Sequence, residues 1–392
     1  MEPSKFKLKN GLPILLYPTP AKSTSIVIGI RLGSITESHN GISHLLEHVV
    51  FEGTKKFPTA LSFAKYLEDF GGECNGSTGK TKTLFYVKVR PEHIDVGLEY
   101  LYELFAQPLL KKESMEKEKK VVLQEIAVLK EEPRLDQWRI FEQALFVNHA
   151  ARLPVSGTRK SVLSLTHEQL LEQYSQAYCA QNAFVVVCGS IPLKMREKLS
   201  QFETIPSGKP MKTTSVVEPN KKTHKRTKKQ LQQSYITMGV KVENISSLDS
   251  IALDILEVIY SKGQSGWLFD EFRNKHSLSY DVFAHHNADG DGSYFACNCV
   301  VLPKFEEQAI ALLKEIFQRK PSKKDVELAK EFLISKYVFD CEDTVYFAQF
   351  LCEEGLDGRE EYLQKVKAMT VEQVHKCIDK YFTSEMTTSI VF

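Results

Sequence analysis

The sequence predicts an α+β protein of two homologous mixed α/β domains, each a sheet packed with helices, joined by a linker. Three observations support this fold class. Strand-like and helix-like apolar patterns alternate along the chain, a polar basic stretch interrupts them, and their order then starts again. The 392 residues are too many for one ordinary domain and suit two domains of about 200 residues.

The first half begins with strand-like apolar runs and continues with helices interleaved with strands. The predicted strands are residues 12–17, 25–32 and 83–90. The predicted helices are residues 41–51, 61–70, 91–105 and 112–131. We therefore expect a mixed α and β domain over residues 1–208.

A basic stretch separates the two halves. The apolar pattern dissolves near Ile205-Pro-Ser-Gly208, and Lys221 to Lys229 is a basic run flanked by polar residues. A nucleic-acid or membrane patch is the alternative, but the run has no interleaved aromatic residues and no periodic apolar face. Residues 209–232 are therefore predicted to be a solvated linker.

After the linker, short stretches of the first half recur in the same order. Ser25-Ile-Val-Ile-Gly29 matches Tyr235-Ile-Thr-Met-Gly239, 210 residues further on. Lys88-Val-Arg-Pro91 likewise matches Val300-Val-Leu-Pro303, 212 residues further on. Residues 233–392 are therefore expected to form a second domain that shares the fold of the first.

Composition argues against several classes of partner. Lys plus Arg number 51 and Asp plus Glu number 50, so no long-range field favours nucleic acid or an anionic membrane. No apolar run approaches the roughly 18 residues of a membrane span, and the first ten residues lack the features of a targeting peptide. The eight scattered cysteines are typical of reduced packing residues. A cytoplasmic protein is expected.

The segment His44-Leu-Leu-Glu-His48 has the H-x-x-E-H pattern of inverted zinc peptidases. On an α-helix, His44 and His48 lie about 40° apart in projection, and Glu47 lies about 60° to the other side of His44. Two imidazoles one turn apart can hold one Zn²⁺ while the neighbouring carboxylate reaches a water on the metal. The alternative is a helix with two ordinary surface or core histidines.

A catalytic zinc site needs a third protein ligand. Glu118 and Glu125 lie seven residues apart in the predicted helix 112–131, so they share one face. Such a pair can supply one ligand and one carboxylate that orients a ligating histidine. A solvated face of a Lys/Glu-rich helix is the alternative.

The segment Asn40 to Thr54 resembles the zinc helix of the pitrilysin, insulysin and mitochondrial-processing-peptidase family of inverzincins. The resemblance implies Zn²⁺ as the cofactor, with Glu125 as its third ligand beside His44 and His48. It also implies that Glu118 supports the ligands from outside and that Glu47 activates the zinc-bound water. In the second half Asp254, Glu257 and Val258 stand where the first half has His44, Glu47 and His48, so a metal site is expected in the first half alone.

The segment Gly71 to Thr78 resembles the family's Gly-Gly-x-x-Asn-Ala-x-Thr, which precedes an edge strand that pairs with the substrate backbone. The resemblance assigns substrate binding to Asn75, Gly76 and Thr78. Gly76 stands where the family usually has Ala, and a glycine is more flexible. A plain turn before a strand is the alternative.

The segment Leu268 to Tyr280 resembles the family's Leu-Phe-x-x-Leu-Arg-x-x-x-Gly-Leu-x-Tyr. The resemblance implies that Arg273 and Tyr280 reach the substrate, where a guanidinium and a phenol can stabilise a developing oxyanion. Ser277 stands where the family usually has Gly. An ordinary surface arginine and a packed tyrosine are the alternative.

The predicted function is that of a zinc-dependent endopeptidase acting on unfolded peptides. A chain of this size resembles half of the closed shell that longer relatives build from four such domains, so we expect a homodimer, or a heterodimer with a related subunit. A dedicated processing protease for one precursor peptide is an alternative. A non-catalytic scaffold subunit is another, since some relatives have lost the zinc ligands, although this chain keeps them.

Overall fold

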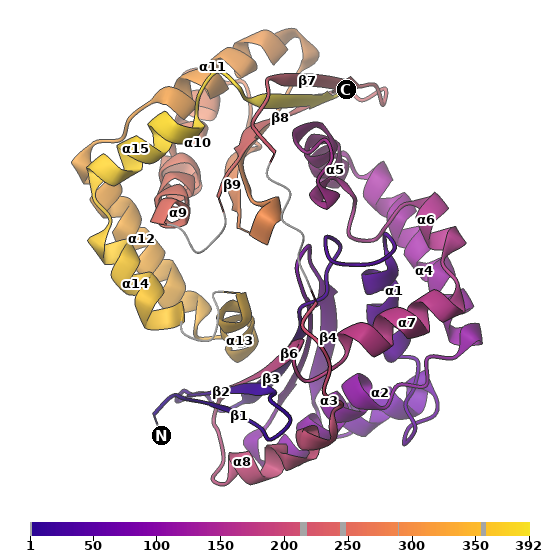
Figure 1. The fold of residues 1–392 in the computed structure, drawn as a ribbon. Helices are drawn as coiled ribbons and strands as arrows, with labels where there is room; N and C mark the ends of the chain where they lie inside the picture. The colour runs from indigo at the N-terminus through magenta and orange to yellow at the C-terminus, as the bar shows by residue number, and fades with distance from the viewer. Residues whose placement is uncertain (1, 212–217, 244–247, 289, 354–357) are drawn as a thin grey trace. The chain divides into compact units, whose positions relative to one another are not determined.

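The computed structural model describes residues 2–211, 218–243, 248–288, 290–353 and 358–392. These residues belong to two compact units (Figure 1). The first unit comprises Met1–Ile126, Pro154–Thr214 and Val338–Arg359. The second comprises Ala127–Leu153, Ser215–Tyr337 and Glu360–Phe392. Each unit therefore contains one short segment from the other half of the chain, whereas the predicted domains are continuous.

The first unit is built on a six-stranded sheet. Its strands are β1 (Ser4–Lys7), β2 (Pro13–Pro18), β3 (Thr24–Ile30), β4 (Glu73–Thr78), β5 (Thr83–Val89) and β6 (Ala183–Gly189). They lie in the order β1-β2-β6-β3-β5-β4, in which β2 and β6 are parallel and all other neighbours are antiparallel. The central strand β3 is buried along its whole length, as its continuous apolar run predicts.

Helices form the main core of the first unit against this sheet. They are α1 (Ile42–Val50), α2 (Ala60–Glu68), α3 (Ile94–Ala106), α4 (Lys112–Glu131), α6 (Arg159–Ser164), α7 (His167–Ala177) and α8 (Met195–Lys198). Alternate residues of β3, Ile26 and Ile28, share one buried cluster with Leu45 of α1 and Leu101 of α3. The two-residue period of the strand thus meets the apolar stripes of the helices.

A helix from late in the chain, α13 (Thr344–Glu353), also packs on this sheet within the first unit. The Thr344 and Ser25 hydroxyls are 2.7 Å apart. The Phe347 ring, 1% exposed, meets the ring of Tyr17 edge-on at 4.9 Å. Side chains of β2 and β3 that point away from the main core are therefore covered by a segment more than 300 residues away.

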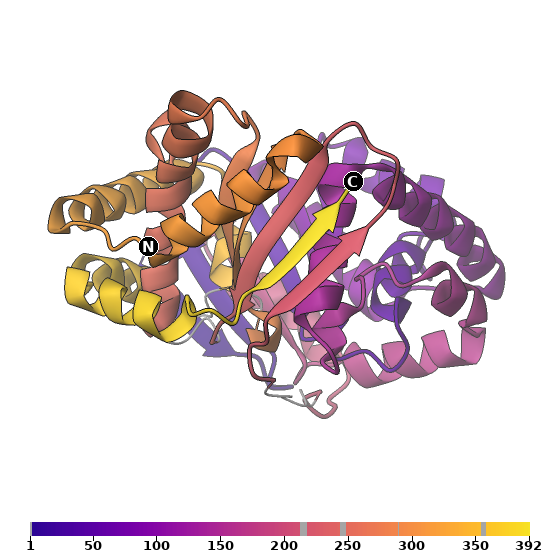
Figure 2. The same ribbon diagram turned by 90° about the horizontal axis from the view of Figure 1, so that it is seen from above.

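The second unit repeats this topology with a five-stranded sheet. Its strands are β7 (Thr223–Thr227), β8 (Ser234–Lys241), β9 (Val282–Asn287), β10 (Tyr294–Val301) and β11 (Thr387–Val391). Their order, β7-β11-β8-β10-β9, matches β2-β6-β3-β5-β4, including the single parallel pair at the same place. Figure 2 shows β11, in yellow, between β7 and β8. The prediction that the two halves share one fold is confirmed.

Helices cover the second sheet as well. They are α5 (Pro133–Leu145), α9 (Leu248–Ser261), α10 (Trp267–Phe269), α11 (Glu306–Gln318), α12 (Lys323–Asp340), α14 (Gly358–Ala368) and α15 (Val371–Tyr381). The early helix α5 packs on β8 and β11, and its Gln137 Oε1 accepts a hydrogen bond of 3.2 Å from Thr237. No helix in the described ranges has the length and apolar character needed to cross a membrane.

Part of the predicted linker is strand β7, which lies at the edge of the second sheet and pairs in parallel with β11. Arg226 forms a 2.6 Å ion pair with Glu306, and Lys229 forms one of 2.6 Å with Asp136. Charged side chains on an edge strand oppose pairing with another chain. The strand pairs with residues near the end of the chain, so the sequence around the basic run contains no sign of its partner.

The packing of α13 leads to a test of how far the first unit depends on this late segment. Phe347→Ala should lower the free energy of unfolding by about 3–5 kcal/mol, because it leaves a cavity against the sheet. Amide hydrogen exchange should become faster in β3 and β6. The neighbouring Tyr346→Ala is the control, since Tyr346 is 46% exposed and should cost less than about 1 kcal/mol. Unchanged protection of β3 in Phe347→Ala would show that the Phe347 ring does not stabilise this sheet.

Candidate metal centre and substrate-binding residues

The start of α1 is held by an acidic side chain that the sequence analysis did not single out. The Glu37 carboxylate accepts hydrogen bonds from the backbone N–H groups of Gly41, at 2.7 Å, and Ser43, at 3.0 Å. Burial raises the pKa of Glu37 to about 7, although these hydrogen bonds act in the opposite direction. Gly41 has φ +91°, and a Cβ there would lie 2.9 Å from Gly157 Cα, so the turn requires glycine.

The two faces of α1 differ sharply in burial. The face toward the core carries fully buried aliphatic side chains: Ile42, Leu45, Leu46, Val49 and Val50. The three polar residues of the motif are only partly buried: His44, Glu47 and His48. Burial of the aliphatic face therefore turns the three motif side chains to the same open side of the helix.

The structure brings His44 and His48 together with Glu125 of α4. Glu125 Oε2 lies 3.9 Å from His44 Nε2 and 3.6 Å from His48 Nε2. One potential ligand atom from each of the three residues lies within 4.8 Å of the other two. Within the described ranges, these residues form the only such group of three or more His, Cys, Asp or Glu side chains.

Glu118, two turns before Glu125 on α4, approaches the other nitrogen of His48. Its Oε2 lies 3.2 Å from His48 Nδ1, and the Glu118 side chain is 10% exposed. A carboxylate at Nδ1 keeps the proton on that nitrogen and leaves Nε2 with its lone pair toward Glu125. The pair on α4 is thus divided into one buried orienting carboxylate and one carboxylate beside both imidazoles.

The three side chains suit a divalent metal such as Zn²⁺. Two imidazole nitrogens and one carboxylate oxygen are a common donor set for zinc, and tetrahedral zinc places its ligand atoms about 3.4 Å apart. The distances of 3.6 and 3.9 Å are close to that spacing. Burial, and to a lesser extent the neighbouring His48, lowers the pKa of His44 to about 4. This imidazole is therefore neutral at pH 7 and can offer a lone pair to a metal. His44 Nδ1 is buried and has no hydrogen-bond partner in the described structure.

Glu47 lies beside this group and against strand β4. Its Oε2 accepts a 2.7 Å hydrogen bond from the Thr78 hydroxyl. A Cβ on Gly76 would lie 2.9 Å from Glu47 Cγ and Oε1, so glycine at this position leaves the room that Glu47 occupies. Burial raises the pKa of Glu47, and the hydrogen bond from Thr78 acts in the opposite direction. Two of the three predicted substrate residues therefore contact the motif glutamate.

Asn75 lies on the other face of β4, since successive side chains of a strand alternate. It is exposed, and its Oδ1 accepts a 2.9 Å hydrogen bond from the Gly76 backbone N–H. β4 is an edge strand of its sheet. The backbone of β4 could pair with an extended segment, but a role of Asn75, Gly76 or Thr78 in substrate binding stays a prediction.

The second unit has a different polar group at the equivalent place. Asp254 and Glu257 of α9 lie 210 residues after His44 and Glu47, and strand register places His286 of β9 at the position of Thr78. His286 Nδ1 lies 2.7 Å from Asp254 Oδ1, and the Tyr362 hydroxyl donates to Asp254 Oδ2 at 3.0 Å. Both oxygens of Asp254 are therefore engaged.

The edge of the second sheet is also closed by α9. The backbone N–H of His286 donates to Glu257 Oε2 at 3.1 Å, and the N–H of Ala284 donates to the Ser261 hydroxyl. In the described part of the first unit, by contrast, no side chain of α1 hydrogen-bonds to the backbone of β4. The neighbouring helix thus caps the edge strand in the second unit, whereas α1 leaves the edge strand β4 uncapped in the first.

Arg273 and Tyr280 belong to the second unit. Arg273 lies in a π-helical turn, Asp270–Lys275, and Tyr280 is 75% exposed with its ring 5.8 Å from that of Phe269. Neither the guanidinium nor the phenol hydroxyl has a hydrogen-bond partner among the described residues. Both groups are available to a ligand, and their action on a substrate stays a prediction.

Comparison with known protein families accounts for both units. The family model described as "Insulinase (Peptidase family M16)" matches residues 14–159, and "Peptidase M16 inactive domain" matches residues 164–333. The chain belongs to peptidase family M16. The family resemblance found in the sequence is therefore confirmed.

Relatives match along nearly the whole chain. The Bacillus subtilis protein named "Uncharacterized zinc protease YmxG" is 25% identical over 99% of this chain and 97% of its own length. The Helicobacter pylori "Zinc protease PqqE" is 26% identical over 98% of this chain and 91% of its own. A crystal structure of a protease from Helicobacter pylori has a TM-score of 0.92 at 24% identity, covering 100% of this chain and 99% of that one. At that identity the likeness shows the fold.

The turn between Arg273 and Tyr280 gives a test of local strain. Ser277 has φ +52°, a left-handed conformation that costs a non-glycine residue about 1–2 kcal/mol. Ser277→Gly should therefore raise the free energy of unfolding by roughly 0.5–1 kcal/mol in denaturant titrations, after the greater freedom of glycine in the unfolded chain is subtracted.

The matched control is Ser335→Gly, at an exposed position inside α12. Glycine in place of serine in an ordinary right-handed helix should lower the free energy of unfolding by roughly 0.3–0.5 kcal/mol, because serine is itself a weaker helix former than alanine. Loss of stability in both variants would show that the turn at Ser277 is not strained.

Proposed function

We propose that this protein is a zinc-dependent endopeptidase that hydrolyses unfolded peptides. The observation that carries the proposal is the convergence of His44 and His48 with Glu125, with Glu47 on the same side of α1. Membership of peptidase family M16 and relatives named zinc proteases support it.

In this proposal His44, His48 and Glu125 hold the zinc, and Glu118 orients His48 through Nδ1. When bound, Zn²⁺ supplies a Lewis acid for the scissile carbonyl and makes water easier to deprotonate. Neutral His44 and the outer carboxylate of Glu118 prepare the protein side of the site for a cation.

Glu47 acts as the general base. It takes a proton from the attacking water and passes it to the leaving amine when the peptide bond breaks. The Thr78 hydroxyl holds one carboxylate oxygen at 2.7 Å, and burial raises the pKa of Glu47 toward the range in which a carboxyl group can both accept and return a proton. In this proposal Glu47 is not itself a metal ligand.

The substrate lies along β4 in an extended conformation. Edge-strand pairing recognises the backbone and tolerates varied side chains, which suits an enzyme for unfolded peptides. Asn75 anchors the segment, while Arg273 and Tyr280 hold the scissile carbonyl and stabilise the charge that develops on it. The position of β4 at the edge of its sheet and the two unpartnered groups of the second unit support this assignment.

Two other functions use the same fold. A dedicated processing protease for one precursor would share the chemistry and differ in the substrate it accepts. A non-catalytic scaffold subunit would not need a base and three ligands together, and all four residues are present here. Retention of Glu47 beside Thr78 favours a catalyst over a scaffold.

Two substitutions separate the base from the metal support. Glu47→Gln should keep about one zinc per chain and lower kcat by at least roughly 100-fold, because it removes the base and no ligand. Glu118→Gln should instead weaken zinc binding by roughly 10–100-fold while the fold survives. Zinc content is measured by metal analysis, zinc affinity by chelator competition and turnover with a quenched peptide.

Glu113→Gln is the matched control, since Glu113 is an exposed glutamate in the first turn of α4. It should leave zinc affinity and kcat unchanged. Wild-type protein that cleaves peptides without metal would sink the proposed function. Wild-type zinc affinity in Glu118→Gln would show that the contact of Glu118 with His48 does not support metal binding.

We also propose that two copies of the chain complete each other's active sites in a homodimer. The resemblance to relatives with four domains implies it, since Arg273 and Tyr280 of one copy would then serve the zinc site of the other. Closed two-fold pairs are the commonest homo-oligomers. A heterodimer with a related subunit is the alternative arrangement.

Mixing two inactive variants tests this arrangement. Glu47→Gln and Arg273→Ala should each be nearly inactive alone, and subunit exchange should restore roughly a quarter of wild-type activity, because half the dimers then contain one whole site of two. The control replaces Arg273→Ala with a chain carrying both substitutions, which should give no rescue. Exchange confirmed by mass without any recovery would mean that Arg273 acts within its own chain or not at all.

A further inference from the structure

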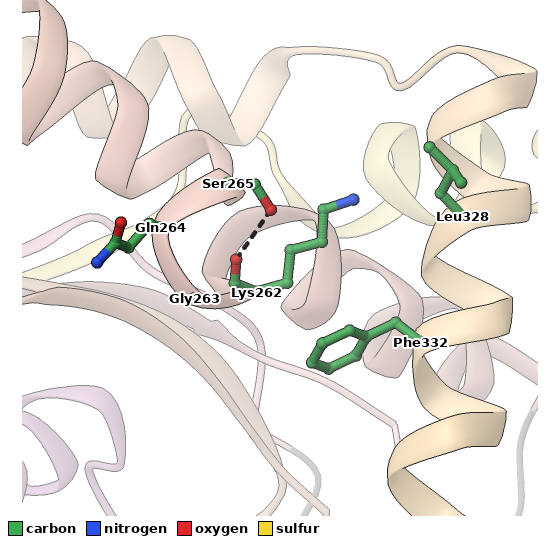
Figure 3. Close-up of a pocket in the computed structure, with 6 residues that line it drawn as sticks. All are labelled: Lys262, Gly263, Gln264, Ser265, Leu328 and Phe332. Atoms are coloured by element: carbon green, nitrogen blue, oxygen red, sulfur yellow. Dashed lines mark hydrogen bonds between the residues drawn. The ribbon is translucent and has the colours of Figure 1, made fainter.

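The second unit contains a pocket of about 500 Å³ that the proposed chemistry does not use. The turn that follows α9, with Lys262, Gly263, Gln264 and Ser265, forms one wall. Leu328 and Phe332 of α12 form the other wall (Figure 3). Its volume lies within the range of roughly 300–1,000 Å³ that is usual for ligand sites.

The wall on α12 is apolar and exposed. Leu328 is 48% exposed and Phe332 is 43% exposed, and the two lie one helical turn apart on the same face. The helix packs into the unit through other positions, among them Val326 and Ala329, which are fully buried. Leu328 and Phe332 are therefore free to contact an apolar group of a ligand.

Lys262 brings a positive charge to this apolar wall. Figure 3 shows its side chain extending from the turn toward α12, with the Phe332 ring also directed into the space between the two elements. The Lys262 ammonium has no acidic partner among the described residues, whereas Lys275 and Lys320 of the same unit pair with Asp270 and Asp379 at 2.9 and 2.8 Å. An unpaired ammonium beside apolar side chains is complementary to a carboxylate attached to an apolar group.

The turn leaves room for such a ligand. Gly263 has φ +48°, and a Cβ built there would have no atom within 4 Å. The Ser265 hydroxyl donates to the Lys262 carbonyl at 3.3 Å and so holds the turn, while the Gln264 side chain points away from Lys262 and Phe332 (Figure 3). The ammonium and the two apolar side chains are therefore the groups that a ligand would meet.

We propose that this pocket binds the C-terminal residue of a peptide, with its carboxylate on Lys262 and its apolar side chain against Leu328 and Phe332. In a peptide, only the last residue joins a free carboxylate directly to the carbon that bears an apolar side chain. This inference rests on the proposed peptidase function and adds a preference for peptides with a free, apolar C-terminus.

The test measures binding without cleavage, in protein carrying Glu47→Gln. The probes are a short fluorescein-labelled peptide ending in Leu, as the free acid and as the C-terminal amide, followed by fluorescence anisotropy. The free acid should bind at least about 10-fold more tightly than the amide, as expected for a charge-assisted hydrogen bond. Adding Lys262→Gln should make the two affinities equal, and adding Phe332→Ser should weaken the binding of both probes.

The matched controls are Lys324→Gln and Leu302→Ser, at exposed positions outside the pocket. They should keep the preference for the free acid. Equal binding of acid and amide, or a preference that survives Lys262→Gln, would overturn the proposal. Binding is measured without turnover, so the two proposals can fail separately. If the wild-type protein cleaves peptides with zinc but the Glu47→Gln protein shows no preference for the free acid, the pocket proposal alone is rejected. If the wild-type protein has no peptidase activity but the Glu47→Gln protein still prefers the free acid, the proposed function alone is rejected.

Discussion

The aliphatic face of α1 packs into the core of the first unit, and this packing sets the direction of every polar side chain on the helix. Each fully buried aliphatic residue contributes on the order of 1.5–3 kcal/mol, so rotation of the helix would cost far more than any one polar contact could return. The Glu37 carboxylate fixes where the helix begins. His44, Glu47 and His48 are therefore held on the open side before any metal or substrate is bound, which is the preorganisation that a catalytic site needs.

The second unit shows what the same frame does with other side chains. Where the first unit has His44 and Glu47, it has Asp254 and Glu257, and His286 takes the position of Thr78. The Asp254 carboxylate is hydrogen-bonded by His286 and Tyr362. Burial, and to a lesser extent the charge of Asp254, raises the pKa of Glu257 to about 7. The helix and strand positions are kept, but both acids are hydrogen-bonded by groups of the same unit instead of being left to face a cation.

Each sheet also has a second face that must be covered, and each is covered by a helix from the other half of the chain. Helix α13 packs on the first sheet and α5 packs on the second. The edge strands of the two sheets differ in how their free edges are protected. Strand β7 carries charged side chains that oppose pairing with another chain. Side chains of α9 accept hydrogen bonds from the backbone of β9, whereas no side chain of α1 hydrogen-bonds to the described backbone of β4. An edge strand beside Glu47 that α1 does not cap is consistent with strand addition by an extended peptide.

The sequence by itself determined the features that repeat within a few turns of chain. Helical and strand periods located α1 and β3 closely, predicted the bounds of α4 as the structure has them, and put His44, Glu47 and His48 on one face. Residues distant in the chain were placed only by the tertiary structure. Spacing alone could not divide the roles of Glu118 and Glu125, which share a helix face, whereas the fold sets Glu118 at His48 Nδ1 and Glu125 at Nε2. Three other features likewise depend on pairings across the fold, which no local period records. They are strand β7, the packing of α13 and α5 on the sheets of the other half of the chain, and the contact of Thr78 with Glu47.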